Sequence, residues 1–222
     1  GAYDSYNNFY GIKKNEPSKI VKISNNGIKS EYFDFGTNIN ILQIDNRIST
    51  EDNFINIIQS SHNLNNGEKD KLYAITSDSI IVIELNAFIM TLPSNTNKYN
   101  LSSNAIDGFD ETSTYSPQPS GSSIVIKDAT LDDNSTDYSD NYLYLIVNVS
   151  YGIYRDKSII KRIALPIDIS LSVDDNNKKF QDIAYLNKID EPQISYDKSN
   201  DKLYILDKKS GYDDKIYSIV LK

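Results

Sequence analysis

The stretch Lys71-Leu72-Tyr73-Ala74-Ile75 is a short apolar run that stops at a polar turn and restarts as Ile80-Ile81-Val82-Ile83-Glu84-Leu85. Two such apolar runs, the second rich in Ile and Val, separated by Thr76-Ser77-Asp78-Ser79, predict a β-hairpin. The same shape returns three times along the chain. These three copies begin at Phe9-Tyr10, Leu143-Tyr144 and Leu203-Tyr204.

The four tyrosines of these hairpins, Tyr10, Tyr73, Tyr144 and Tyr204, stand between 60 and 71 residues apart. Structural repeats usually recur every ~20–50 residues, so insertions must account for the excess. The motif Leu203-Tyr204-Ile205-Leu206-Asp207 resembles the LYxxD-like hairpins of β-propeller proteins. The resemblance covers four pieces of about 15 to 25 residues each and implies an all-β, propeller-like array of antiparallel hairpins.

A β-sandwich is the alternative fold, because Leu-Tyr pairs are good strand formers in any sheet. The chain contains no tryptophan, so the tryptophan-containing signatures of propeller repeats are missing. At 222 residues, it has a length that all-β domains commonly reach without splitting. The sequence therefore predicts a single all-β domain over residues 1–222.

Charge and composition exclude several classes of partner. The formal net charge is −8, so the surface should repel nucleic acid. The absence of cysteine excludes disulfides and thiolate-bound zinc, and the single histidine excludes zinc sites with several histidines. No run approaches the ~18 consecutive apolar residues of a membrane-spanning helix, so no membrane span is expected in this segment.

The chain is expected to be extracytoplasmic, at a bacterial cell surface or in the periplasm. Its heavy use of Ile, Asn, Lys and Tyr is typical of AT-rich bacterial genomes, which is an association rather than a physical argument. A protein in either place can lack disulfides. A lipid anchor on the full-length chain is compatible with this sequence, because the anchoring cysteine would lie outside the segment.

Two segments depart from the hairpin pattern. Residues 49–64 carry a helical pattern, with acidic residues in the first turn and Phe54, Ile57 and Ile58 at helical spacing, although the same residues would serve equally as a strand. Residues 93–123 are almost free of periodicity and predict a long irregular loop.

Exposed aromatic residues on loops can stack on sugars or contact peptide side chains. Candidate binding residues are Tyr99, Phe109 and Tyr115 in the 93–123 stretch, together with Tyr151 and Tyr154 in the loop of the third hairpin. The alternative for residues 93–123 is a loosely packed insertion that binds nothing.

The acidic stretch 132–141 concentrates four carboxylates and two amides in ten residues. Calcium takes about six to eight oxygen ligands, and this stretch could supply several of them. The candidate ligands are Asp132, Asp133, Asn134, Asp137 and Asp140. The EF-hand pattern fails, because Asp137 stands where that loop needs glycine. An ordinary polar turn is the alternative, and no other cofactor is expected.

The residue types favour a binding role over catalysis. No phosphate-binding glycine loop and no GxSxG motif occurs in the chain. The sequence therefore predicts a non-catalytic binding module that engages a protein or glycan through its loops. Two alternatives remain open. One is a propeller-type glycan-processing enzyme with two close carboxylates, and the other is a purely structural fragment of a larger surface protein.

Overall fold

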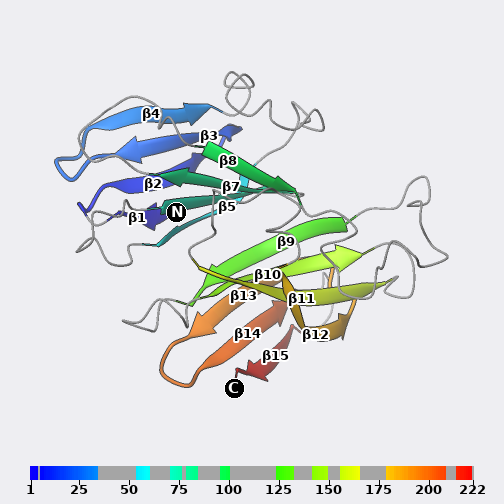
Figure 1. Ribbon diagram of the computed structural model, residues 1–222. Helices are drawn as coiled ribbons and strands as arrows, with labels where there is room; N and C mark the ends of the chain where they lie inside the picture. Colours follow the sequence, from blue (N-terminus) through cyan, green and yellow to red (C-terminus); the bar gives the residue numbers. More distant parts are fainter. Residues whose placement is uncertain are drawn as a thin grey trace. The chain divides into compact units, whose positions relative to one another are not determined.

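The computed structural model (Figure 1) describes residues 1–4, 6–34, 54–60, 71–76, 79–84, 96–100, 124–132, 142–149, 156–165, 179–208 and 214–221. Within these ranges the protein is all-β, its sheets are antiparallel, and no helix occurs. Contacts group the chain into two compact units, Gly1–Tyr99 and Asn100–Lys222. The single domain over residues 1–222 stays a prediction.

The first unit contains two four-stranded sheets whose strands follow one another in chain order. Sheet A consists of β1 (Ala2–Tyr3), β2 (Phe9–Lys13), β3 (Glu16–Ile23) and β4 (Lys29–Asp34). Sheet B consists of β5 (Phe54–Ser60), β6 (Lys71–Thr76), β7 (Ser79–Glu84) and β8 (Thr96–Asn100).

The second unit contains a four-stranded and a three-stranded sheet, again in chain order. Sheet C consists of β9 (Ile124–Leu131), β10 (Tyr142–Val149), β11 (Lys157–Ala164) and β12 (Gln181–Asn187). Sheet D consists of β13 (Pro192–Asp197), β14 (Lys202–Asp207) and β15 (Lys215–Val220).

All four predicted hairpins are confirmed as antiparallel pairs: β2 with β3, β6 with β7, β10 with β11, and β14 with β15. In every sheet the tyrosine-marked strand is the second in the chain order. Asn25-Asn26-Gly27 forms the turn between β3 and β4. Gly27 has a φ of +84°, a conformation that favours glycine, and its N–H donates to the carbonyl oxygen of Ser24 at 2.8 Å.

The four marker tyrosines do not share one environment. Tyr10, Tyr73 and Tyr144 are buried, whereas Tyr204 is 37% exposed. Side chains alternate between the two faces of a strand, and β14 buries Leu203 and Ile205 in the core, so Tyr204 points to the opposite face. Tyr144 is buried whichever face of the strand it lies on, because β10 is buried on both of its faces.

The core of the second unit lies between sheets C and D. Tyr144, Ile146 and Ile160 of sheet C share one buried cluster with Ile194, Leu203 and Ile205 of sheet D. The sheets are also linked through their first strands, because the backbone N–H of Ile194 in β13 donates to Asp128 Oδ2 in β9 at 2.9 Å. The second unit is therefore held together by both apolar packing and a directional hydrogen bond.

Two sequence-based expectations need correction. The helical alternative for residues 49–64 is wrong at residues 54–60, where the strand alternative is confirmed: these residues form β5 and pair antiparallel with β6. Asn56 is a poor helix former, and the branched Ile57 and Ile58 suit a strand that gains hydrogen bonds to a neighbour. The predicted irregular stretch 93–123 contains β8 at Thr96–Asn100, and its residues 93–95 and 101–123 lie outside the described residues.

A closed ring of three hydrogen bonds lies buried in sheet C. Ser158 Oγ donates to Asn148 Oδ1 at 2.6 Å, and Asn148 Nδ2 donates to the carbonyl oxygen of Ile189 at 2.7 Å. The backbone N–H of Ile189 closes the ring by donating to Ser158 Oγ at 2.9 Å. The ring ties β10 and β11 to the segment that leads into sheet D, and its burial makes each bond costly to lose.

A buried ion pair joins β11 to the outer strand β12 of the same sheet. Lys161 of β11 is fully buried and donates to Asp182 Oδ1 of β12, directly across the two strands. The hydroxyl of Tyr185 donates to the other oxygen, Asp182 Oδ2, at 2.9 Å. A charge removed from water is tolerated only when it is paired, so this contact fixes the register of β11 against β12.

Lys161→Met is expected to lower the free energy of unfolding by about 3–5 kcal/mol, because it leaves the Asp182 carboxylate without its cation. The measurement is urea unfolding followed by circular dichroism. Lys157→Met removes a lysine whose bond to Asn187 is exposed, and should cost less than about 0.5 kcal/mol. The double variant Lys161→Met/Asp182→Leu should regain most of the loss. Equal losses of unfolding free energy for Lys161→Met and Lys157→Met would contradict the stabilising role of the buried ion pair.

Candidate binding site

The richest group of functional side chains in the described residues lies on the face of sheet C that meets sheet D. The register of β10 and β11 places Tyr144 directly opposite Arg162, and Tyr142 lies on the same face two residues earlier. Tyr196 of β13 reaches this group from sheet D. These four residues, Tyr142, Tyr144, Arg162 and Tyr196, form the tyrosine–arginine cluster.

The rings of the cluster contact one another in sequence. The Tyr144 and Tyr196 rings are stacked, with centroids 6.2 Å apart and planes inclined at 19°. The Tyr142 ring is tilted against Tyr144 at a centroid distance of 6.1 Å. The Arg162 guanidinium lies over the Tyr142 ring, 4.5 Å from its centroid, which is within range of a cation–π interaction.

Hydrogen bonds fix the orientation of the outer members of the cluster. Arg162 Nε donates to Gln181 Oε1 of the neighbouring strand at 2.9 Å. The Tyr196 hydroxyl donates to Asp201 Oδ1 at 3.2 Å. Asp132, a buried carboxylate just after β9, acts electrostatically on Tyr196. The cluster is thus pre-arranged rather than loosely exposed.

Burial and nearby carboxylates keep the phenols of this site neutral. Loss of solvent raises the pKa of Tyr144 above its ordinary value, and the charge of Asp132 adds to the shift while Arg162 opposes it. The pKa of Tyr196 is raised by burial first, and then by Asp132 and Asp201. Both hydroxyls therefore remain protonated and able to donate at physiological pH.

The arrangement suits recognition of a ligand. Tyr144 and Asp132 are buried, whereas Tyr142, Arg162 and Tyr196 are partly exposed around them and Asp201 is exposed. Tyr and Arg are the residues that contribute most binding energy in protein interfaces, since each offers apolar area together with a polar group. Their side chains here are held by packing before any ligand arrives.

No known protein-family model matches this chain, and no curated protein is significantly similar to it. What the site can do therefore follows from its own geometry.

The structure places few of the residues that the sequence singled out. Tyr99 lies in β8, where the backbone alone is described. Phe109, Tyr115, Tyr151 and Tyr154 lie outside the described residues. Their role in binding stays a prediction.

Of the five candidate calcium ligands, Asp132 alone is described, and it is buried beside Tyr144 and Tyr196. Asp133, Asn134, Asp137 and Asp140 lie outside the described residues. Within the described ranges, no group of three His, Cys, Asp or Glu side chains is placed to hold a metal ion. In those same ranges, no helix has the length and apolar character to cross a membrane.

Sequence reasoning missed the tyrosine–arginine cluster. The alternation in β10 predicts that Leu143, Leu145, Val147 and Val149 face the core, and it leaves Tyr142 and Tyr144 on the other face. That other face is buried as well, because sheet D covers it. The β10–β11 hairpin register could have placed Arg162 opposite Tyr144, but the approach of Tyr196 depends on packing between sheets.

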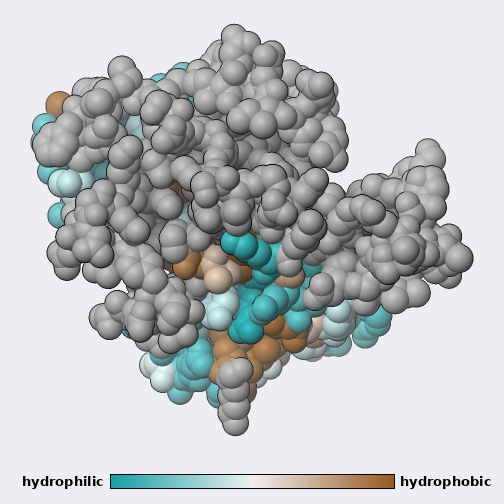
Figure 2. Space-filling model, viewed as in Figure 1, coloured by the Kyte–Doolittle hydropathy of each residue, from teal (hydrophilic) through white to brown (hydrophobic). Residues whose placement is uncertain are grey.

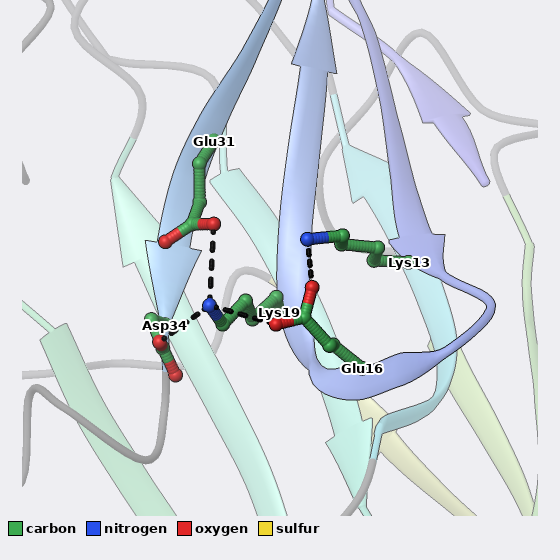
Figure 3. A network of polar contacts seen from close by, with 5 residues as sticks. All are labelled: Lys13, Glu16, Lys19, Glu31 and Asp34. Carbon is green, nitrogen blue, oxygen red and sulfur yellow. Dashed lines mark ion pairs between the residues drawn. The ribbon is translucent and has the colours of Figure 1, made fainter.

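A second polar cluster, drawn in Figure 3, joins three strands of sheet A. Lys19 Nζ lies 3.1 Å from Glu16, 3.4 Å from Glu31 and 3.3 Å from Asp34, and Lys13 pairs with Glu16. Desolvation of Lys19 acts to lower its pKa, but Asp34 and Glu31 outweigh it and raise the pKa above its ordinary value. We assign this cluster a structural role, because its three carboxylates already form ion pairs with lysines of the same sheet.

A third cluster closes the loop between β1 and β2. Asp4 is buried and accepts four hydrogen bonds, from the backbone N–H groups of Tyr6 and Asn8, from Asn8 Nδ2 and from the Tyr10 hydroxyl, at 2.8 to 3.1 Å. Burial, aided by Asp4, raises the pKa of Tyr32 to about 12. Since both Asp4 oxygens are satisfied within its own loop, we assign this cluster a structural role.

Alkaline pH should destabilise the protein through the cluster. A raised folded-state pKa stabilises the native state fully below the unfolded tyrosine value of about 10, and this contribution is lost as pH rises through the folded value. Tyr196→Phe removes one such group. When the pH is raised from about 9 to about 12, the Tyr196→Phe variant should therefore lose less of its free energy of unfolding than the unsubstituted protein, as measured by urea unfolding. Tyr204→Phe is the control on the opposite face of sheet D, and a Tyr196→Phe curve parallel to the unsubstituted one would contradict the assignment.

Proposed function

We propose that this chain is a non-catalytic binding module whose tyrosine–arginine cluster engages a protein partner. The observation that carries the proposal is the set of Tyr142, Arg162 and Tyr196, partly exposed and held in place around buried Tyr144. Rigid aromatic side chains lose little conformational entropy on binding. A partner would cover the ring edges, accept hydrogen bonds from Arg162 and donate hydrogen bonds to Asp201.

A glycan is the alternative ligand for the same site. Aromatic residues beside an arginine and a carboxylate also offer a stacking surface with polar groups at its edge. The cluster departs from that chemistry in one respect, because the guanidinium of Arg162 already covers one face of the Tyr142 ring. The protein partner is therefore preferred.

We also propose that the four sheets are blades of a propeller-like array. Support comes from the uniform topology, in which each sheet is an antiparallel meander and its tyrosine-marked strand comes second. The resemblance of Leu203-Tyr204-Ile205-Leu206-Asp207 to propeller hairpins points the same way. In such folds the loops at one end of the strands commonly carry the binding function.

Alanine at Tyr142 should weaken binding by at least about tenfold, because it removes an anchor of the proposed contact surface. The probes are peptides selected from a random phage-displayed library on the immobilised chain, measured by isothermal calorimetry, with a glycan array in parallel. Arg162→Lys keeps the charge but loses the planar guanidinium, and should also weaken binding. Tyr6→Ala, an exposed tyrosine of the first unit, is the matched control.

Circular dichroism and urea unfolding establish that each variant is folded before its binding is compared. Peptides that bind Tyr142→Ala and Arg162→Lys as tightly as the unsubstituted chain would contradict the protein-partner proposal. Hits on the glycan array alone, lost in the same two variants, would assign the cluster to the glycan alternative.

We propose an extracytoplasmic location, at a bacterial cell surface or in the periplasm, supported by the composition. In the bacterium that encodes the chain, an antibody should detect the protein in the periplasmic or surface fraction. Protease added to intact cells, or to cells with a permeabilised outer envelope, should degrade it while a cytoplasmic enzyme remains intact. Co-fractionation with that cytoplasmic enzyme would contradict the proposal.

A further inference from the structure

Sheet D differs from the other three sheets in its number of strands. Within the described ranges, sheets A, B and C each have four strands, whereas sheet D has three, and β15 hydrogen-bonds to β14 along one side. Among the residues that the structure describes, no strand pairs with the other side of β15. An open edge of this kind presents unpaired backbone N–H and C=O groups and is a template for another strand.

The outer face of sheet D beside this edge carries exposed apolar side chains. Ile216 is 71% exposed and Val220 is 54% exposed. The register places Ile216 opposite Leu206, and Ser218 opposite Tyr204, so these side chains share one face, away from the core that holds Leu203 and Ile205. Figure 2 shows hydrophobic residues gathered in the region that β15 occupies in Figure 1.

The β15 strand is complementary to itself. Ile216 and Val220 lie two residues to either side of Ser218, on the same face of the strand. If two copies of β15 pair antiparallel with the two Ser218 residues opposite each other, each Ile216 meets the Val220 of the other copy. Lys215, the one charged residue of the strand, then falls opposite Leu221, so no like charges meet directly.

We propose that β15 pairs with β15 of a second copy of this chain, joining two three-stranded sheets into one continuous six-stranded sheet. The contact is isologous, with a two-fold axis at Ser218, and therefore closes as a dimer instead of growing into a fibre. It satisfies the open edge and covers Ile216 and Val220. It leaves the tyrosine–arginine cluster free, because Tyr196 lies on the opposite face of sheet D from these residues.

Cross-linking tests the register directly, because the chain contains no cysteine of its own. Directly opposed residues of an antiparallel pair have Cβ atoms about 4.5 to 5.5 Å apart, close enough for a disulfide after small adjustments. Ser218→Cys should therefore form a covalent dimer under mild oxidation. Ser195→Cys, at an exposed serine on the outer face of β13, is the matched control and should not form a covalent dimer. A mixture of Ile216→Cys with Val220→Cys should cross-link, whereas neither variant should cross-link efficiently alone.

Sedimentation equilibrium of the complete chain tests the association itself. At high protein concentration, in about 0.15 M salt to screen the net charge of −8, the mass should approach twice 25.1 kDa. Ile216→Lys should weaken dimerisation by at least tenfold, whereas Ile28→Lys, the same change at an exposed turn residue of the first unit, should leave it unchanged.

A monomer at every concentration would overturn the proposal, and so would a Ser195→Cys variant that cross-links as fast as Ser218→Cys. Hydrogen exchange gives an independent outcome. Concentration-dependent protection of the β15 amides supports the dimer, whereas full protection in a dilute monomer would show that another segment of the same chain covers the edge, which also overturns the proposal.

Discussion

The packing of sheet C against sheet D is the constraint on which the second unit depends. Tyr144, Ile146 and Ile160 meet Leu203 and Ile205 in one buried cluster, and each such side chain contributes about 1.5 to 3 kcal/mol when it leaves water. A single four-stranded sheet cannot cover both of its own faces. Sheet D therefore makes it possible for β10 to be apolar on both sides.

Polar groups within this packing define its register. An apolar cluster alone tolerates strands that slide past one another, since Ile and Leu contacts are not directional. The Lys161–Asp182 pair and the ring of Asn148, Ser158 and Ile189 are directional and buried, so a slip of one residue would leave charges or amides without partners. We therefore assign stability to the apolar cluster and uniqueness to these two polar groups.

The two faces of sheet D have different roles. Its inner face carries Tyr196 to the tyrosine–arginine cluster and fixes the position of that ring against Tyr144. Its outer face carries Ile216 and Val220 to solvent at an open edge. Because successive residues of a strand alternate between faces, a short sheet can present a pre-arranged polar–aromatic site on one side and an association surface on the other.

The sequence by itself determined the strands. Alternating apolar runs closed by polar turns predicted all four tyrosine-marked hairpins, because these signals are local. Where local signals were balanced, as in residues 54–60, pairing with β6 decided in favour of a strand. Tertiary structure alone decided which face of each strand is covered. It buried Tyr144 and exposed Tyr204 from the same Leu-Tyr pattern, and it stacked the Tyr196 ring on Tyr144, since burial depends on the neighbouring sheet and not on the strand's own residues.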